Sequence, residues 1–555
     1  MEETASTGSS STPSTSWLDR PVFSFLPGLT WETFLVIVIL VLAVVSRFTL
    51  LGARVMSHDE TNHVVPSFDL YQGRGYVHNP VTHGPFQFHV IALTYFLFGA
   101  TDFTSRLPAA LFGIAAIAFV LFAYRRYLGR IGALVAGFLF LISPYMLFYS
   151  RYTRNEAFIM LIGVVLLYAV LRYLEDGQSK WLYLLTGMLV FHFIVKETAY
   201  IYTALLLVFL AVLFLRDLWR WSWPSSRERN DAIGLLLVAL VALVAGVGIG
   251  VLFSPKVPTD QTAGALLSPS LAAGNPTLTQ LVSIALAVLG VLLLIAAALR
   301  LVRGMTWDGL RRLRSFNLLF LTITLVLPLL AGLPEKLIGF NPLDYSSQGM
   351  FQSGIFIVLL FVVAFALGMA WDFSLWLKNA ALFYAIFTVF YTTFFTNGGG
   401  FFTGLLGALG YWLDQQSLER IKQPLYYYLV VQIPIYEYLS AIGTLFAAYF
   451  ALRYHRLWGK PSAHPGQDLD VPFTSEIGAS TIPVPDTGID PLRQEDEAGS
   501  GTGPISPMSQ PEGGGGAEEE ELLSDSNQRS IWRGLPATQG ESGLPIAALL
   551  LYWAL

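Results

Sequence analysis

Two adjacent acidic residues, Asp59 and Glu60, follow the first long apolar run of the chain, within the sequence HDETNH. Five of the eight histidines lie between His58 and His89. Carboxylates and imidazoles can move protons and ligate cations. A carboxylate at the edge of a bilayer costs free energy unless it is hydrated, paired or bound to a cation. We therefore predict catalytic or cation-binding use of the acid pair at a membrane surface, where a lipid-linked substrate could react. The alternative is a pair of solvated loop acids.

The same segment could also hold a divalent metal ion. If residues 58–70 are helical, Asp59 and His63 lie four residues apart on one face. Oxygen and imidazole ligands suit several metals. The segment is not a His-Glu-x-x-His zinc motif, because Asp59 follows His58. A divalent ion at Asp59 and His63 is therefore one prediction, a hydrogen-bonded histidine is the other, and the sequence indicates no further cofactor.

Basic residues stand out between two later apolar runs. The sequence SRYTRNE carries Arg151, Arg154 and Glu156. Guanidinium groups match phosphate oxygens, so this segment predicts an anion site. An ion pair of Arg154 with Glu156 or with Asp59 is the alternative, and both can hold together.

A second cation lies at Lys196, again between two apolar runs. A lysine at the membrane edge could hold a lipid phosphate, although Glu197 could simply neutralise it. His78 and His83 each come shortly before a proline, where helix is disfavoured. We predict a turn there, with His58, His78 and His83 as candidate substrate contacts.

A long segment at 397–424 combines a glycine-rich turn with aromatic and amide side chains. Rings can stack on sugars while amides bond hydroxyl groups. The predicted substrate-binding residues are Tyr411, Trp412, Gln415 and Gln416. An interfacial aromatic belt is the alternative explanation.

The elements that position these residues are membrane helices. The chain has 555 residues, of which 54% are hydrophobic and only 13% charged. Soluble domains have about a quarter of their residues charged, so this composition predicts an all-α polytopic membrane protein. The absence of cysteine excludes disulfides and thiolate chemistry. The apolar runs lie near 31–51, 108–124, 131–149, 156–174, 181–195, 200–216, 232–253, 279–299, 316–332, 353–371, 379–396 and 425–451. They predict about 12–13 transmembrane helices.

The distribution of basic residues predicts how the chain crosses the membrane. The most basic short loops are RRYLGR, RDLWRWSWPSSRER, RLVRGMTWDGLRRLR and RYHRLWGK. All four lie on the cytoplasmic side, with the N-terminus, if the short run 86–100 does not cross. We therefore expect 86–100 to form an outer juxtamembrane helix; a short tilted span is the alternative.

Composition divides the chain into four parts. Residues 1–30 are Ser/Thr-rich and predicted to be disordered, and 31–460 form the transmembrane domain. Residues 461–544 are rich in Pro, Gly, Ser and acids, and are predicted to be a disordered cytoplasmic segment. Residues 545–555 look like the start of an incomplete transmembrane helix.

The pattern across 55–200 resembles the GT-C superfamily of membrane glycosyltransferases, in particular the protein O-mannosyltransferases and the aminoarabinose transferases acting on lipid A. The likeness rests on the Asp-Glu pair, HGPFQFH, the SRLPAALFG stretch, RRYLGR, and Ser143-Pro144 followed by an acid. The segment 391–428 is similar to the flippase-activity-associated membrane proteins. Glu156 stands where related enzymes often have Asp, and the chain ends where that family would continue with further spans.

The resemblance implies a GT-C-like bundle that transfers a sugar from a polyprenyl-phosphate donor to an acceptor hydroxyl on the outer face of the cell membrane. Asp59 would be the general base, with inversion at the anomeric carbon. Glu60 and Glu156 would orient the acceptor or hold a divalent ion. Arg151, Arg154 and Lys196 would bind the donor phosphate. The partners would be the lipid donor, membrane lipid and a glycan, lipid or protein acceptor, without nucleic acid.

Two other functions fit the same residues. A transport or flippase component would move a lipid-linked saccharide without catalysis, and would not need a base beside the phosphate. An inactive scaffold of an envelope glycan complex is the other alternative.

Overall fold

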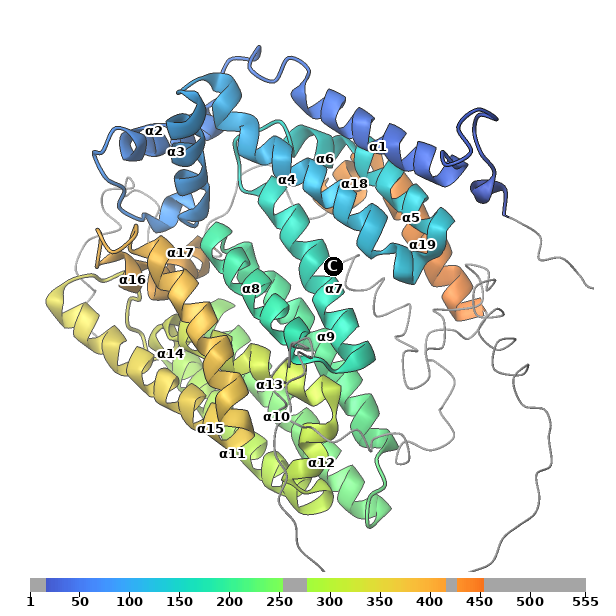
Figure 1. Ribbon diagram of the computed structural model, residues 1–555. Coiled ribbons are helices and arrows are strands. Elements are labelled where there is room, and N and C mark those ends of the chain that lie inside the picture. The colour runs from blue at the N-terminus through green and yellow to red at the C-terminus, as the bar shows by residue number, and fades with distance from the viewer. Residues whose placement is uncertain (1–15, 253–276, 416–426, 454–555) are drawn as a thin grey trace, which may run out of the picture.

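A computed structural model describes residues 16–252, 277–415 and 427–453 of the chain (Figure 1). These residues form helices throughout, and their only β contact is a bridge between Pro21 and Thr30. Seven of the described helices are long and apolar enough to cross a membrane. They are α1 (Trp31–Phe48), α4 (Asp102–Ala123), α7 (Glu156–Asp176), α9 (Thr198–Arg220), α10 (Ser226–Leu252), α11 (Leu278–Met305) and α15 (Ser347–Tyr391). The chain is therefore an all-α integral membrane protein, as its composition predicts.

Several other expected spans form shorter or broken helices among the described residues. The run 131–149 is divided into α5 (Arg125–Ile142) and α6 (Pro144–Tyr149), because Pro144 begins a new helix. The runs 181–195 and 316–332 form α8 (Ser179–Val195) and α13 (Arg314–Val326) with η4 (Leu327–Leu330). The runs 353–371 and 379–396 join in α15, which is kinked at Asp372. The expected number of spans therefore exceeds the number of helices that have full spanning length.

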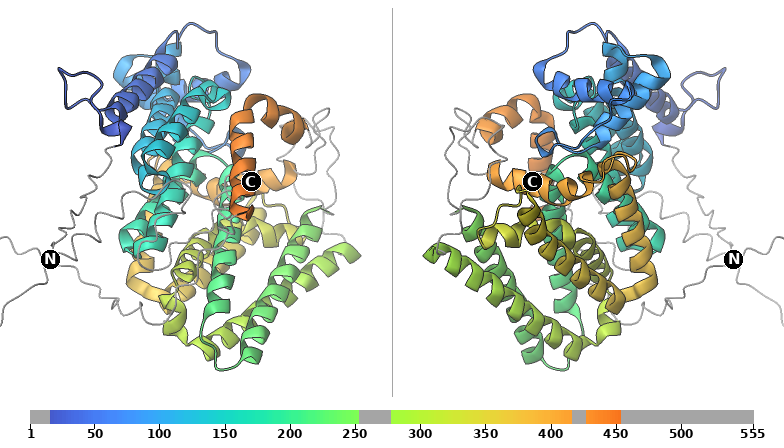
Figure 2. Two further views of the ribbon diagram at one scale, coloured as in Figure 1. Left: turned by 90° about the vertical axis from the view of Figure 1, so that its right-hand side faces the viewer. Right: turned by 90° about the vertical axis from the view of Figure 1, so that its left-hand side faces the viewer.

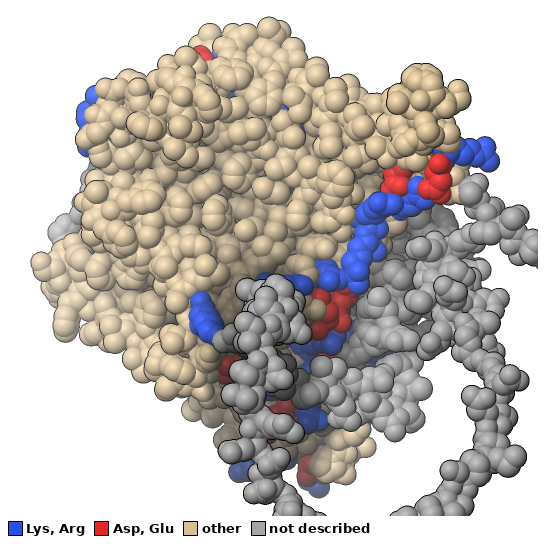
Figure 3. Space-filling model, viewed as in Figure 1, with Lys and Arg blue, Asp and Glu red and all other residues tan. Residues whose placement is uncertain are grey.

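The N-terminal part is more ordered than its composition predicts. Of residues 1–30, expected to be disordered, residues 16–30 form η1 (Trp17–Asp19) and the Pro21–Thr30 bridge. Arg130 of α5 binds Asp19 and Glu32 together. These ion pairs hold the segment 16–30 against α5, and this segment, unlike the Ser/Thr-rich residues before it, is rich in apolar side chains. Figure 3 shows charged residues gathered along one edge of an otherwise largely uncharged face.

Two helices pack together at the end of α4 (Figure 1). They are α2 (His58–Tyr71) and α3 (Phe86–Phe98), joined through η2 (Pro80–Thr82). With 13 residues, α3 is about 20 Å long, whereas a bilayer core is about 30 Å thick. This length supports a juxtamembrane helix over a crossing one.

The central bundle consists of α7, α8, α9, α13 and α15, and its buried side chains are mostly apolar. Inside it, the Thr186 hydroxyl donates to Asn379 and the Trp376 indole donates to Thr324. Such bonds fix the relative positions of helices that have no hydrophobic drive to associate in lipid. Figure 2 shows α10 and α11, which pack against each other, at the end of the molecule far from α1.

The remaining described elements are short, with at most 16 residues each. These are α12 (Trp307–Arg312), α14 (Gly332–Leu337), α16 (Gly400–Phe402), η5 (Thr403–Gly407), α17 (Ala408–Gln415), η6 (Tyr427–Gln432), α18 (Ile433–Tyr436) and α19 (Tyr438–Arg453). The expected disordered segment 461–544 and the apolar end 545–555 lie outside the described residues.

Candidate active site

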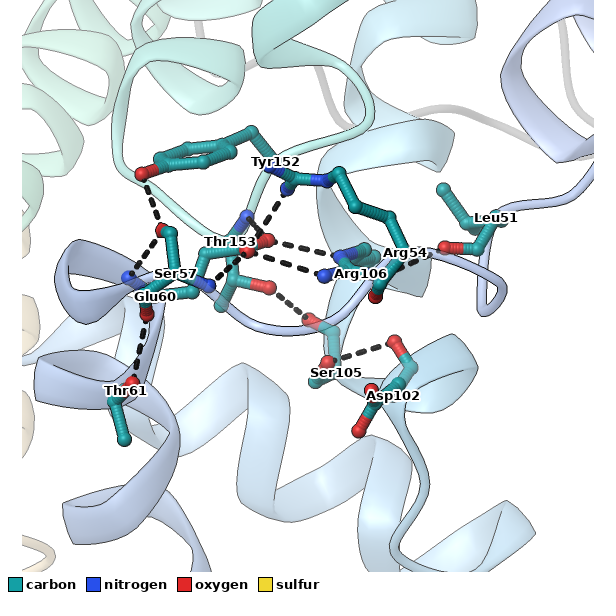
Figure 4. Close-up of polar contacts among 10 residues, drawn as sticks. All are labelled: Leu51, Arg54, Ser57, Glu60, Thr61, Asp102, Ser105, Arg106, Tyr152 and Thr153. Carbon is teal, nitrogen blue, oxygen red and sulfur yellow. Dashed lines mark hydrogen bonds and ion pairs between the residues drawn. The ribbon is translucent and has the colours of Figure 1, made fainter.

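Glu60 is the buried anchor of helix α2. Its carboxylate accepts hydrogen bonds from the guanidinium of Arg106 at 2.8 and 3.1 Å and from Arg54 at 2.8 Å (Figure 4). The backbone N–H groups of Ser57 and Thr153 donate to the same carboxylate, each at 3.1 Å. Burial alone would raise the pKa of Glu60, but these hydrogen bonds, led by that of Arg106, bring the pKa below its usual value.

The same residues start the helix and set its position. Ser57 and Glu60 form a reciprocal capping box, which satisfies two free N–H groups at the start of α2. Arg106 also donates to the carbonyl groups of Leu51 and Arg54. Because Glu60 and Arg106 are both fully buried and fully bonded, we assign Glu60 to positioning α2 and not to substrate contact.

Asp59 faces the opposite way from its neighbour. Its side chain is 51% exposed, and its Oδ2 accepts a 2.8 Å hydrogen bond from Arg154. The anchoring of Glu60 therefore presents Asp59 at the surface of α2, beside the turn that precedes α7.

Asp59 and Arg154 belong to a short row of alternating charges. The Nε of Arg154 lies 3.7 Å from Glu156, and Glu156 accepts a 2.6 Å hydrogen bond from Lys196. The order is thus Asp59, Arg154, Glu156 and Lys196, drawn from α2, the start of α7 and the corner between α8 and α9. Glu156 Oε2 is buried and has no hydrogen-bond partner. This row brings together four of the predicted residues, and two of them are cations that could meet a phosphate.

Arg151 does not join this row. Its guanidinium donates to backbone carbonyl groups of Ser46, Arg47 and Thr49, where α1 ends. Unsatisfied carbonyl groups at a helix end are a common partner for arginine. The predicted phosphate contact at Arg151 is therefore replaced by an observed role in holding α1.

The histidines of the first long segment separate into different environments. His58 is exposed at the start of α2. His78 is buried, and its Nδ1 lies 2.9 Å from the Thr403 hydroxyl of η5. Burial lowers the pKa of His78 to about 4, so that the ring is neutral near pH 7. His78 therefore links the first long segment to the glycine-rich region after α15.

His83 lies at the centre of the predicted turn. Its Nδ1 is 2.7 Å from Glu197 Oε2. Its φ of 71° is rare for a residue other than glycine and costs about 1–3 kcal/mol unless the surroundings enforce it. The next residue, Gly84, donates to the Val195 carbonyl, and a Cβ at Gly84 would lie 2.2 Å from the Ile194 carbonyl oxygen. Glycine is thus required where this turn contacts the end of α8.

Lys196 and Glu197, between α8 and α9, do not pair with each other, although the sequence allowed Glu197 to neutralise Lys196. Lys196 binds Glu156, whereas Glu197 binds His83. The side chains of adjacent residues point in different directions where a helix ends, so sequence neighbours with opposite charge need not pair.

His63 is buried next to this corner. Its ring contacts Phe88 and His83 edge to face, and its Nδ1 has no hydrogen-bond partner. Burial, and then the nearby His83, Arg154 and Lys196, lower the pKa of His63 to about 3. Asp59, the other residue predicted to bind a divalent ion, accepts a hydrogen bond from Arg154. Among the residues that the structure describes, no group of three or more His, Asp or Glu side chains is placed to hold a metal ion.

The predicted sugar-binding segment is described in part. Tyr411 and Trp412 are half-buried on α17, which packs beside η2 and α14. This places them near the turn that carries His78 and His83. The side chain of Gln415 and the whole of Gln416 lie outside the described residues.

Two important residues had not been predicted as functional. Arg106 lies in the SRLPAALFG stretch, and an arginine inside an apolar helix is a signal that a buried partner exists. Tyr152 bonds Ser57 at 2.6 Å, but a tyrosine at a membrane edge gives no comparable signal.

Comparison with known proteins bears on this part of the chain. The dolichyl-phosphate-mannose-protein mannosyltransferase family matches residues 82–245. No curated protein matches the chain. The family match confirms, over those residues, the likeness to GT-C membrane glycosyltransferases.

Two solved structures illustrate the more distant similarities. One is ArnT from Cupriavidus metallidurans bound to undecaprenyl phosphate, with 17% identity, a TM-score of 0.29, and coverage of 70% of this chain and 78% of that one. The other is the Archaeoglobus fulgidus oligosaccharyltransferase in complex with zinc and sulfate. It has 15% identity, a TM-score of 0.30, and coverage of 79% of this chain and 58% of that one.

Proposed function

We propose that this chain is a glycosyltransferase that moves a sugar from a polyprenyl-phosphate donor to an acceptor hydroxyl on the outer face of the cell membrane. The observation that carries the proposal is the exposed carboxylate of Asp59 beside the row Arg154, Glu156 and Lys196. The family match at 82–245 includes three members of this row. ArnT, bound to undecaprenyl phosphate, is a similar protein that takes such a lipid.

In the proposed reaction, Asp59 takes the proton of the acceptor hydroxyl. The acceptor oxygen then attacks the anomeric carbon from the side opposite the phosphate, which inverts its configuration. A base must be within hydrogen-bond reach of the proton it removes. The exposure of Asp59 allows an acceptor to approach it, whereas the buried Glu60 is not accessible.

The phosphate leaving group gains negative charge as its bond to the sugar breaks. Arg154 and Lys196 stabilise that charge, because cations aimed at a developing anion lower the barrier. Both cations already contact carboxylates, so the donor phosphate replaces part of those contacts when it binds. Glu156 Oε2, which is buried without a hydrogen bond although Arg154 lies 3.7 Å away, accepts a hydrogen bond from the acceptor or donor sugar.

The same arrangement explains how the substrates would enter. A lipid-phosphate donor diffuses within the membrane and needs no nucleotide-binding motif. Tyr411 and Trp412 are the proposed aromatic contacts for the sugar rings, because they are half-buried on α17, which packs beside η2 of the His78–His83 turn. The acceptor is a glycan, lipid or protein hydroxyl.

The proposal is tested by incubating the purified full chain in lipid nanodiscs with a panel of polyprenyl-phosphate sugars. We expect release of polyprenyl phosphate and transfer of the sugar for at least one donor. Asp59→Asn should lower turnover by roughly 10²–10⁴-fold, the range for loss of a general base. Arg74→Gln, in the exposed Asp69–Arg74 pair, is the matched control and should keep full activity.

A competing outcome points to a transport function. Movement of a lipid-linked saccharide across liposomes, without bond cleavage and unaffected by Asp59→Asn, would contradict glycosyl transfer.

A further inference from the structure

His83 and Glu197 form a carboxylate–imidazole pair that the mechanism above does not use. The 2.7 Å contact joins His83 Nδ1 to Glu197 Oε2, with the side chains 23% and 8% exposed. A carboxylate at Nδ1 fixes a proton on that nitrogen and leaves Nε2 for a ligand; in the imidazolium form, Nε2 carries a second proton that it can donate. The pair therefore uses Nδ1 and leaves Nε2 as the ring nitrogen that could contact a ligand.

The backbone holds this pair in place at a conformational cost. His83 has a φ of 71°, and Gly84 fixes the turn through its bond to Val195. Strained residues of this kind cluster at ligand sites, because the surrounding structure must enforce them. The strain at His83 places its ring against Glu197, at the corner that also carries Lys196.

A second observation points to a ligand at the same place. His63 lies with its ring centre 6.1 Å from that of His83, and its Nδ1 is buried without a partner. Buried polar atoms without partners are rare and call for a missing water or ligand. The link to the charge row is the chain itself, because Glu197, which contacts His83, directly follows Lys196, which contacts Glu156.

We propose that His83, oriented by Glu197, donates a proton from Nε2 to the departing phosphate oxygen of the donor. This inference deepens the proposed function and rests on it. It makes His83 a catalytic residue that contacts the donor phosphate, and Glu197 the positioning residue behind it.

The step balances as follows. The acceptor O–H proton passes to Asp59, and the acceptor oxygen forms a bond to the anomeric carbon. The bond from that carbon to the phosphate oxygen breaks, and its electron pair stays on the phosphate. The Nε2 proton of His83 moves to a phosphate oxygen, which leaves neutral His83 and protonated polyprenyl phosphate. Water returns a proton to His83 and removes one from Asp59.

The row of charges Asp59, Arg154, Glu156 and Lys196 gives a reason for a proton donor beside the phosphate. Arg154 and Lys196 each already contact a carboxylate, Asp59 and Glu156 respectively. Their charge is thus partly compensated before the donor binds. A proton delivered to the phosphate neutralises charge that these cations leave uncompensated.

The test is chemical rescue of His83→Gly in the full chain. Glycine adopts a positive φ without strain, so the turn should remain folded. We expect turnover to fall roughly 10²-fold in His83→Gly. Added imidazole should raise the turnover of this variant at least about tenfold, because it can occupy the space that the side chain leaves. His83→Asn, which also tolerates this backbone conformation but fills the space, should be equally slow and insensitive to imidazole. Glu197→Gln should lower turnover with little change in the donor KM.

Three results would overturn the inference while leaving the proposed function intact. The first is wild-type turnover in His83→Gly. The second is a slow, folded His83→Gly enzyme that imidazole does not rescue. The third is a His83→Gly enzyme in which only the donor KM changes. Failure of the wild-type chain to cleave any donor in the panel would instead contradict the proposed function.

Discussion

The carboxylate of Asp59 and the guanidinium of Arg154 are joined at 2.8 Å across the gap between α2 and the turn that precedes α7. The next residue, Glu60, is bonded inward to Arg106. Two adjacent acids of nearly the same chemistry thus have opposite surroundings, one exposed and one fully buried. They should respond differently to substitution, and this difference separates catalysis from folding.

Asp59→Ala should abolish sugar transfer and leave membrane insertion and folding intact. Its ion pair with Arg154 is half exposed, and exposed pairs contribute little to stability. The measurements are turnover with a verified donor and the melting temperature in detergent. Transfer at the wild-type rate would remove Asp59 from the mechanism.

Glu60→Gln should destabilise the protein by about 3–5 kcal/mol, because the guanidinium of Arg106 would stay buried without its counter-charge. Thermal unfolding in detergent, compared with Asp69→Asn in an exposed pair, gives the effect. An unchanged melting temperature would show that Glu60 does not anchor α2.

Lys196→Ala should weaken use of the donor more than use of the acceptor, because Lys196 is proposed to face the donor phosphate. Steady-state kinetics with each substrate varied in turn separate the two. Lys180→Ala, whose ammonium contacts Trp181 at the opposite end of α8, is the control. Equal loss for donor and acceptor would argue against a phosphate contact.

Glu335 gives a pH-dependent prediction. It is buried on α14 with neither carboxylate oxygen in a hydrogen bond of normal geometry, and burial, offset in part by the Ser353 hydroxyl, raises the pKa of Glu335 to about 7. Between pH 4.5 and 7 the folded state binds more protons than the unfolded state, so stability falls as pH rises through this window. Glu335→Gln removes this loss, and should raise stability at pH 8 by about 1–3 kcal/mol with little effect at pH 4.

Melting temperatures of wild type and Glu335→Gln across pH 4–8 check this prediction. Glu228→Gln, at the exposed start of α10, is the control. Parallel pH curves for wild type and Glu335→Gln would show that Glu335 ionises normally.

The sequence by itself determined the helical membrane architecture, because apolar runs of spanning length admit few other structures in lipid. It also singled out the acid pair and the cations Arg154 and Lys196, since charge is costly at a membrane edge. It could not decide where the helices break: the runs 353–371 and 379–396 look separate, yet α15 continues through both.

Tertiary structure decided the partners. Only the contact of Arg106 on α4 with Glu60 on α2 shows that Glu60, and not Asp59, is the buried acid, because Arg106 is 46 residues away along the chain. Likewise Lys196 could pair with its neighbour Glu197, but the break after α8 directs it to Glu156 and leaves Glu197 for His83. Ion pairs act over a few ångströms in space, and sequence spacing does not fix distances between helices.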